Sequence, residues 1–214
     1  MRVAIASGKG GAGKTLLSTN LAHVIAQQQK VLLVDCDVEE PNSALFFPSD
    51  ETDTHPVLSY YPEWNPASCL FCSKCTQVCA FNAIISLPDE VIPFDRLCHG
   101  CYACAELCPT GSLTMTPRQT GDEPAVPIIK ATLSSMEQRR QPGQITLIDA
   151  PPGTACPTQE VLAHCDMVIL VTEPTPYGLH DLKLAWDLSV SLGHTTTIVV
   201  NRAGREIHPP TERT

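Results

Sequence analysis

The first 35 residues arrange their apolar and polar positions in the order expected for a strand, a loop and a helix. An apolar run from Arg2 to Ala6 leads into a glycine-rich segment, after which residues 16–29 repeat apolar side chains at helical spacing. A second continuous apolar run, Val31 to Val34, ends in Asp35. Continuous apolar strands are typical of parallel sheets that are covered on both faces. The pattern therefore predicts a parallel β-α-β unit.

The same texture returns in the second half of the chain. Helical patterns near residues 158–164 and 179–192 connect further strand-length apolar runs. These runs span residues 144–148, 167–171 and 196–200, and they are followed by Asp149, Thr172 and Asn201. Alternating strands and helices predict an α/β fold with a doubly wound, mostly parallel sheet.

The middle of the chain differs from both flanks. From about Phe47 onward, prolines, tyrosines and acidic residues lead into a stretch with two cysteine runs and no long helical periodicity. The two runs repeat one short motif. We expect residues 1–58 and 118–214 to form the α/β domain, with residues 59–117 inserted as a small α+β domain.

Composition narrows the class of protein. The chain of 214 residues has a formal net charge of −9, which argues against a nucleic acid or an anionic membrane surface as partner. No apolar stretch is long enough to span a bilayer, and the N-terminus resembles a strand and not a signal peptide. We therefore expect a cytoplasmic protein, in which eleven cysteines stay reduced and grouped cysteines indicate metal.

The glycine-rich segment after the first predicted strand matches the P-loop pattern G-x-x-x-x-G-K-[ST]. Its backbone N–H groups are expected to surround phosphates, with a lysine charge on the β/γ-phosphates and a hydroxyl on Mg²⁺. A glycine-rich packing turn is the alternative, but the strand-to-helix context favours ATP. The expected ATP-binding residues are Gly8, Gly10, Gly11, Ala12, Gly13, Lys14 and Thr15.

Lys9 adds a further signature, because Lys-Gly-Gly-x-Gly-Lys-Thr is the deviant Walker A loop. This part of the chain resembles the MinD/ParA-type P-loop ATPases, in which two subunits face each other across ATP. The resemblance implies a homodimer in which Lys9 reaches the nucleotide of the partner subunit. It also implies catalytic roles for Lys9, Lys14, Asp37 and Asp149, with Asp37 positioning the attacking water.

The same resemblance implies the metal and base contacts. Asp35 and Asp149 become carboxylates on the Mg²⁺ side together with Thr15, and Asn201 and Arg202 fall where the family recognises adenine. A carboxylate at a strand end is by itself more often merely solvated. Asp35 and Asp149 follow buried strands beside the P-loop, where open α/β sheets bind ligands, and this position favours a functional role for them.

Each cysteine run follows the bacterial ferredoxin pattern C-x-x-C-x-x-C-x-x-x-C. Three successive cysteines at this interval favour a [4Fe–4S] cluster over a zinc site, which uses paired C-x-x-C units, and over disulfides. The fourth cysteine of each run lies too far along the chain to ligate the same cluster as the first three, and it ligates the other cluster. We therefore assign one cluster to Cys69, Cys72, Cys75 and Cys108, and the second to Cys98, Cys101, Cys104 and Cys79.

Other residues near these motifs have weaker signals. Cys36, Cys156 and Cys165 lack mutual spacing and are expected to be small buried side chains, although Cys156 follows a loop at which the nitrogenase iron protein holds a cluster between subunits. His99 lies inside the second run, where it could tune a cluster or simply be exposed.

As a whole, the chain resembles MinD-superfamily ATPases with an inserted ferredoxin domain. It ends soon after Asn201, where the family continues with further β-α units, so the sequence looks shortened at Ile207–Thr214. The resemblance implies ATP-driven dimer switching coupled to electron transfer, with an unidentified redox partner. Two alternatives stay open, a carrier that passes clusters to an acceptor protein and a passive module that nucleotide merely rigidifies.

Overall fold

The computed structural model describes residues 1–47, 54–118 and 125–204. The chain divides into two compact units: Met1–Thr52 together with Thr132–Thr214, and Asp53–Ala131. Residues 207–214, on which the expectation of a shortened C-terminus depends, lie outside the described residues.

The first unit is built on a five-stranded sheet in the order β2-β7-β1-β8-β9, and all its neighbouring strands are parallel. The predicted parallel α/β architecture is therefore confirmed. Its strands are β1 (Arg2–Ala6), β2 (Val31–Asp35), β7 (Ile145–Asp149), β8 (Met167–Thr172) and β9 (Thr195–Val200).

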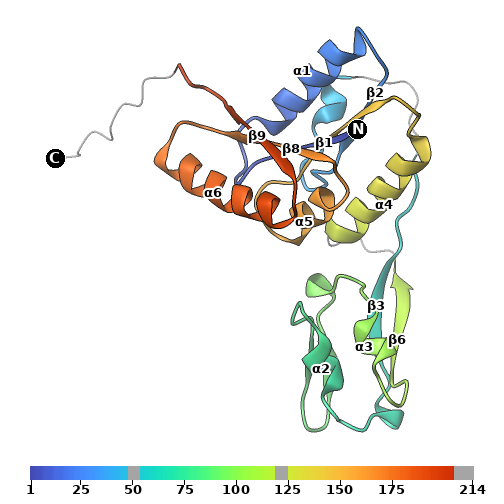
Figure 1. Cartoon of the computed structure of the whole chain (residues 1–214). Coiled ribbons are helices and arrows are strands. Elements are labelled where there is room, and N and C mark those ends of the chain that lie inside the picture. The colour runs from blue at the N-terminus through green and yellow to red at the C-terminus, as the bar shows by residue number, and fades with distance from the viewer. Residues whose placement is uncertain (48–53, 119–124, 205–214) are drawn as a thin grey trace, which may run out of the picture. The chain divides into compact units, whose positions relative to one another are not determined.

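Helices cover both faces of this sheet. The connection from β1 to β2 runs across the sheet in the opposite direction to the connections from β7 to β8 and from β8 to β9. Since parallel crossovers are right-handed, the helices of these two sets of connections lie on opposite faces (Figure 1). Val3, Ile5, Leu147 and Val171 form the core between the sheet and the first helix. The helices are α1 (Lys14–Ala26), α5 (Cys156–Leu162) and α6 (Pro176–Ser191), and a 3₁₀ turn spans Ser43–Leu45.

One long helix, α4 (Ala125–Arg139), is absent from the sequence expectations. Its buried side chains Val126, Ile129, Leu133 and Met136 recur at helical spacing. In the sequence, Pro127 argues against a helix at this point. It lies in the first turn of α4, however, where a missing N–H costs no helical hydrogen bond.

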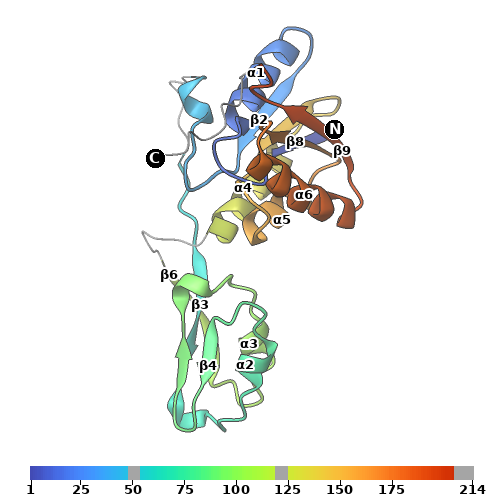
Figure 2. The same ribbon diagram turned by 90° about the vertical axis from the view of Figure 1, so that its left-hand side faces the viewer.

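The second unit consists of two similar halves. Each half runs through a strand, a 3₁₀ turn, a short helix and a second strand, so the sequence repeat is also a structural one. Figure 2 shows this unit as a narrow assembly of ribbons and short helices. The first half contains β3 (Ser59–Trp64), Pro66–Ser68, α2 (Lys74–Val78) and β4 (Ile84–Ser86). The second contains β5 (Val91–Pro93), Asp95–Leu97, α3 (Ala103–Glu106) and β6 (Leu113–Arg118).

The halves are joined by antiparallel pairing at both ends. Strand β3 pairs with β6 over its whole length, from Ser59 opposite Arg118 to Trp64 opposite Leu113, and β4 pairs with β5. The first strand of the unit thus lies beside its last one.

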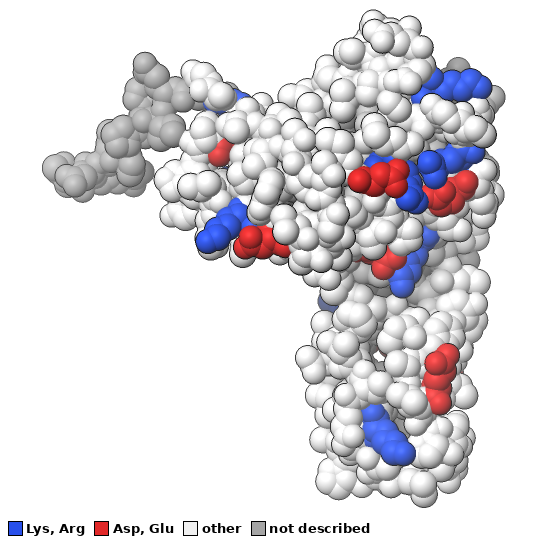
Figure 3. Space-filling model, viewed as in Figure 1, with Lys and Arg blue, Asp and Glu red and all other residues white. Residues whose placement is uncertain are grey.

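The distribution of charged side chains on the surface agrees with the negative net charge of the chain. On the face shown in Figure 3, acidic and basic side chains are scattered and do not gather into a basic patch. Within the described residues, no helix is both long and apolar enough to cross a membrane.

Candidate functional site

The segment between β1 and α1 forms a tight loop around the helix N-terminus. Gly11 and Gly13 have φ values of 77° and 100°, a left-handed backbone that favours glycine. At Gly8, a Cβ atom would lie 2.1 Å from the carbonyl oxygen of Asp181 in α6. The loop therefore packs against the body of the unit at a distance that only glycine permits.

Lys14 begins α1 and is buried, with 6% of its surface exposed. Its Nζ lies 4.0 Å from Oδ2 of Asp37, which follows β2. Partial burial raises the pKa of Asp37, while Lys14 acts in the opposite direction. The structure thus brings together two of the residues for which the sequence predicted catalytic roles.

Asp35 and Asp149 meet at the carboxyl edge of the sheet, because they are register partners on the neighbouring strands β2 and β7. Asp35 accepts hydrogen bonds from the backbone N–H groups of Asp37 at 3.0 Å and Ser43 at 2.9 Å. Asp149 has no exposed surface, and neither of its oxygens has a hydrogen-bond partner among the described residues.

The isolation of Asp149 has an electrostatic consequence. Burial raises the pKa of its carboxyl to about 6, and the charge of Asp35 adds to the effect. The side chain of Thr15 offsets part of this rise without reaching hydrogen-bond geometry. A buried, unpartnered carboxylate beside a P-loop threonine fits a divalent cation, which would supply the missing countercharge.

Asp149→Asn is expected to stabilise the protein at pH 8 in the absence of nucleotide and Mg²⁺. A carboxyl whose pKa rises from 3.8 to about 6 on folding favours the folded state below 3.8 and loses that benefit as pH rises through 6. The ionised group therefore costs up to roughly 3 kcal/mol at pH 8. Urea unfolding at pH 8 and pH 5 measures the difference, which should shrink at pH 5.

Asp35→Asn provides the control for this prediction. Its carboxylate accepts two backbone N–H groups, so the amide should destabilise the protein at pH 8. A destabilised Asp149→Asn at pH 8 would contradict the prediction.

Lys9 and Arg202 converge on one acidic side chain that the sequence analysis did not identify. Lys9 Nζ lies 3.7 Å from Oε2 of Glu173, and Arg202 Nη1 contacts the other oxygen of Glu173. Glu173 follows β8 just as Asp149 ends β7. The rule that ligands bind at the carboxyl ends of parallel strands was a signal that could have identified it.

Asn201 connects the end of β9 to the P-loop. Its Nδ2 donates a hydrogen bond of 2.9 Å to the carbonyl oxygen of Ala12, and a Cβ at Gly13 would meet the same nitrogen at 2.4 Å. Beside it lies an open hollow of about 650 Å³, lined by Gly13, Leu16, Leu17, Asn20, Val171, Val199 and Asn201. The apolar lining, which sequence reasoning missed, and the amide of Asn201 together suit a flat heterocycle such as adenine.

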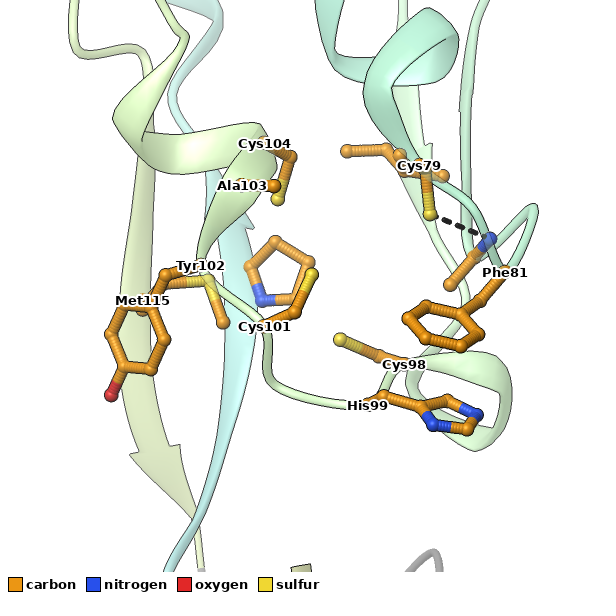
Figure 4. A pocket seen from close by; sticks show the side chains of 12 residues that line it. Cys79, Phe81, Cys98, His99, Cys101, Tyr102, Ala103, Cys104 and Met115 are labelled. Atoms are coloured by element: carbon orange, nitrogen blue, oxygen red, sulfur yellow. Dashed lines mark hydrogen bonds between the residues drawn. The ribbon is translucent and has the colours of Figure 1, made fainter. Parts of the chain in front are cut away.

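In the second unit, four cysteines from both runs line one pocket of about 350 Å³. Figure 4 shows their sulfur atoms directed into a common space. Backbone N–H groups point at two of the sulfurs, with Ala83 N at 3.2 Å from Cys79 and Gly100 N at 3.4 Å from Cys98. The four residues are Cys79, Cys98, Cys101 and Cys104.

The other four cysteines of the runs line a second pocket of about 330 Å³. They are Cys69, Cys72, Cys75 and Cys108. The fourth cysteine of each run thus lies with the first three of the other run, which is the grouping that the spacing predicts. Four convergent sulfurs with backbone N–H groups aimed at them fit a [4Fe–4S] cluster, whose charge such donors stabilise.

The surroundings affect the thiols differently. At Cys108 burial opposes ionisation, but hydrogen bonds from the Ser112 hydroxyl and from nearby backbone groups lower its pKa to about 6. At Cys104 burial raises the pKa to about 11. At Cys69 burial also opposes ionisation, but the nearby Trp64 N–H, which falls short of hydrogen-bond geometry, and the backbone N–H of Phe71 lower the pKa.

All eleven cysteines are free, so none forms a disulfide. Cys36 and Cys165 are buried, as expected, whereas Cys156 at the start of α5 is partly exposed. The proposed intersubunit role of Cys156 stays a prediction. His99 stacks on Phe81 at a centroid distance of 3.8 Å. Within the described ranges, no group of three or more His, Cys, Asp or Glu residues is arranged around a single metal ion; a cubane gives each cysteine its own iron.

Comparison with known proteins gives three informative similarities. The model of the CobQ/CobB/MinD/ParA nucleotide binding domain matches residues 3–213. The uncharacterized protein MJ0579 of Methanocaldococcus jannaschii is 28% identical over 228 residues, which span 95% of this chain and 81% of that protein. Hydrogenase-4 component A of Escherichia coli K12 is 30% identical over 123 residues, which span 57% of this chain and 54% of that protein.

Among solved structures, the septum site-determining protein MinD of Pyrococcus horikoshii, complexed with Mg-ADP, has a similar fold. The TM-score is 0.55 at 21% identity, and the match covers 98% of this chain and 74% of that one. At this identity the likeness concerns the fold.

Proposed function

Since this chain belongs to the CobQ/CobB/MinD/ParA nucleotide-binding family, we propose that it is a cytoplasmic ATPase that couples MgATP to electron transfer through two [4Fe–4S] clusters. The observation on which this proposal rests is the gathering of eight cysteines into two pockets of four within a chain that also has a P-loop. When bound, the clusters supply one-electron redox chemistry.

The nucleotide half of the proposal is supported by the carboxyl edge of the first unit. In this proposal Lys14 supplies a charge for the β/γ-phosphates. Thr15, Asp35 and Asp149 would hold Mg²⁺. In the proposed mechanism Asp37, which lies beside Lys14, orients the attacking water. The solved MinD structure of similar fold contains Mg-ADP, which agrees with this assignment.

A homodimer completes the proposed cycle. Lys9, paired with Glu173 inside its own chain, leaves this acidic partner and reaches the nucleotide of a second copy. Nucleotide-dependent association and hydrolysis then alternate, as expected for the deviant Walker A loop. The similarity to hydrogenase-4 component A agrees with a redox function, and an unidentified redox partner protein is part of the same proposal.

Anaerobic purification followed by iron and sulfide analysis tests the cluster half of the proposal. The protein should be brown, and dithionite should give the electron paramagnetic resonance signal of reduced [4Fe–4S] clusters. Adding MgATP should then change the rate at which the reduced protein transfers electrons to a dye acceptor.

Three outcomes would count against parts of the proposal. A colourless protein, or one with zinc at its sulfurs, would remove the clusters. Identical transfer rates with and without MgATP would remove the coupling. Loss of iron to an added apo-ferredoxin at a rate that depends on MgATP would favour a cluster carrier instead.

A further inference from the structure

The two cysteine pockets are formed by equivalent positions of the two halves, so they can be compared residue by residue. Aligning Cys69 with Cys98 also aligns Cys108 with Cys79. Four positions that differ between the pockets are then Trp64 against Pro93, Ser86 against Met115, Thr110 against Phe81, and Ser112 against Ala83.

One pair of backbone donors is shared by both pockets, and the Cys79 sulfur accepts a further backbone bond from Ala83 N at 3.2 Å. The N–H of Phe71 lies 3.4 Å from the sulfur of Cys69, and the equivalent N–H of Gly100 lies 3.4 Å from the sulfur of Cys98. These bonds belong to the loop that both halves repeat. They consequently do not distinguish one pocket from the other.

Side-chain donors gather around the pocket of Cys108. The hydroxyl of Ser112, which is 2% exposed, lies 3.2 Å from the Cys108 sulfur, and the hydroxyl of Thr110 lies at 3.8 Å. Because a thiolate can only accept, both hydroxyls donate to it. Two further lining groups, Nε1 of Trp64 and Oγ of Ser86, are shielded from solvent and have no hydrogen-bond partner among the described residues.

The pocket of Cys79 is lined by apolar side chains at three of the matching positions, and Pro93, the counterpart of Trp64, is not among its lining residues. Phe81, Ala83, Met115 and Pro93 contain no side-chain N–H or O–H group. The imidazole of His99 lies flat against Phe81, at an angle of 4°, and Figure 4 shows it turned away from the sulfurs. Figure 4 also shows the Tyr102 hydroxyl directed away from the sulfurs, so this pocket stabilises added negative charge mainly through the backbone.

We propose that the pocket of Cys69, Cys72, Cys75 and Cys108 holds the cluster with the higher reduction potential. The proposal rests on the two-cluster function proposed above and adds the order in which the two clusters are reduced. Reduction adds one negative charge to a cluster and its sulfurs, and hydrogen bonds to sulfur stabilise the reduced form. One electron from a one-electron reductant therefore resides at this pocket, and the Cys79 pocket is reduced second.

The test is a redox titration of the intact, anaerobically purified protein, followed by electron paramagnetic resonance. The wild type should be reduced in two steps. Ser112→Ala, which installs the residue of the other pocket, should lower the midpoint of the first step only. At a fixed potential we expect the ratio of reduced to oxidised cluster to change about tenfold, which corresponds to a midpoint shift of about 59 mV for one electron.

Two further variants complete the design. Ala83→Ser, the reciprocal exchange, should raise the midpoint of the second step only. Trp64→Phe keeps the ring and removes the N–H, so it should lower the first midpoint even if Ser112→Ala fails to fold. Coincident midpoints in the wild type, or a Ser112→Ala shift in the second step, would overturn the inference. Absence of any cluster signal would instead overturn the proposed function.

Discussion

Lys14→Ala should lower MgATP hydrolysis by at least about a hundredfold, because it removes the one buried cation that the described P-loop offers to the phosphates. The residue is only 6% exposed, and its ammonium lies 4.0 Å from Oδ2 of Asp37. Without it, the triphosphate would face the Asp37 carboxylate with no intervening positive charge. Fluorescent ATP binding and phosphate release, measured on the same preparation, should both fall.

Two control variants sharpen this test. Lys30 has an exposed side chain that donates a hydrogen bond to Gln141, so the variant Lys30→Ala should retain ATP binding and hydrolysis. Lys9→Ala should retain binding but lose hydrolysis, since the proposed role of Lys9 is in the partner subunit. Unchanged ATP affinity in Lys14→Ala would contradict the phosphate site itself.

Cys79→Ala should remove about half of the bound iron, and the iron lost should belong to the cluster of the second run. The structure groups Cys79 with Cys98, Cys101 and Cys104, although its own run begins at Cys69. A cubane that lacks one of four thiolates is usually unstable or loses iron. Iron analysis of the purified variant measures this loss.

Double variants decide which cysteines share a cluster. Adding Cys98→Ala to Cys79→Ala should cause little further loss of iron, whereas adding Cys69→Ala should remove nearly all of it. Ligation within each run would give the reverse result. Cys165→Ala, a buried thiol that donates to the Leu162 carbonyl oxygen, should leave the iron content unchanged.

The sequence predicted the parallel sheet well, because its central strands β1, β7 and β8 are largely buried and therefore have continuous apolar runs. It also placed Asp35 and Asp149 at strand ends, and the parallel topology makes these two residues register partners. The spacing of the cysteine runs likewise predicted the groups of four that line each pocket.

Other features depend on contacts that no local pattern encodes. Glu173 meets Lys9 and Arg202 only because β8 ends beside the P-loop. Helix α4 was not predicted, because Pro127 near its start argues against a helix. The strands β3 and β6 contain Pro62 and Pro117, which are unfavourable inside a sheet, and their pairing depends on residues from both ends of the unit.

The pairing of Ser59 with Arg118 places the start of the first strand of the cysteine-rich unit beside the end of its last strand. A segment whose two ends meet can be accommodated in a surface loop of a host domain without separating the strands of the host. In evolutionary terms, such a cassette could be acquired or discarded in a single event at one loop. For protein engineers, the two adjacent strand ends mark the positions at which to attempt excision or grafting of residues 59–118.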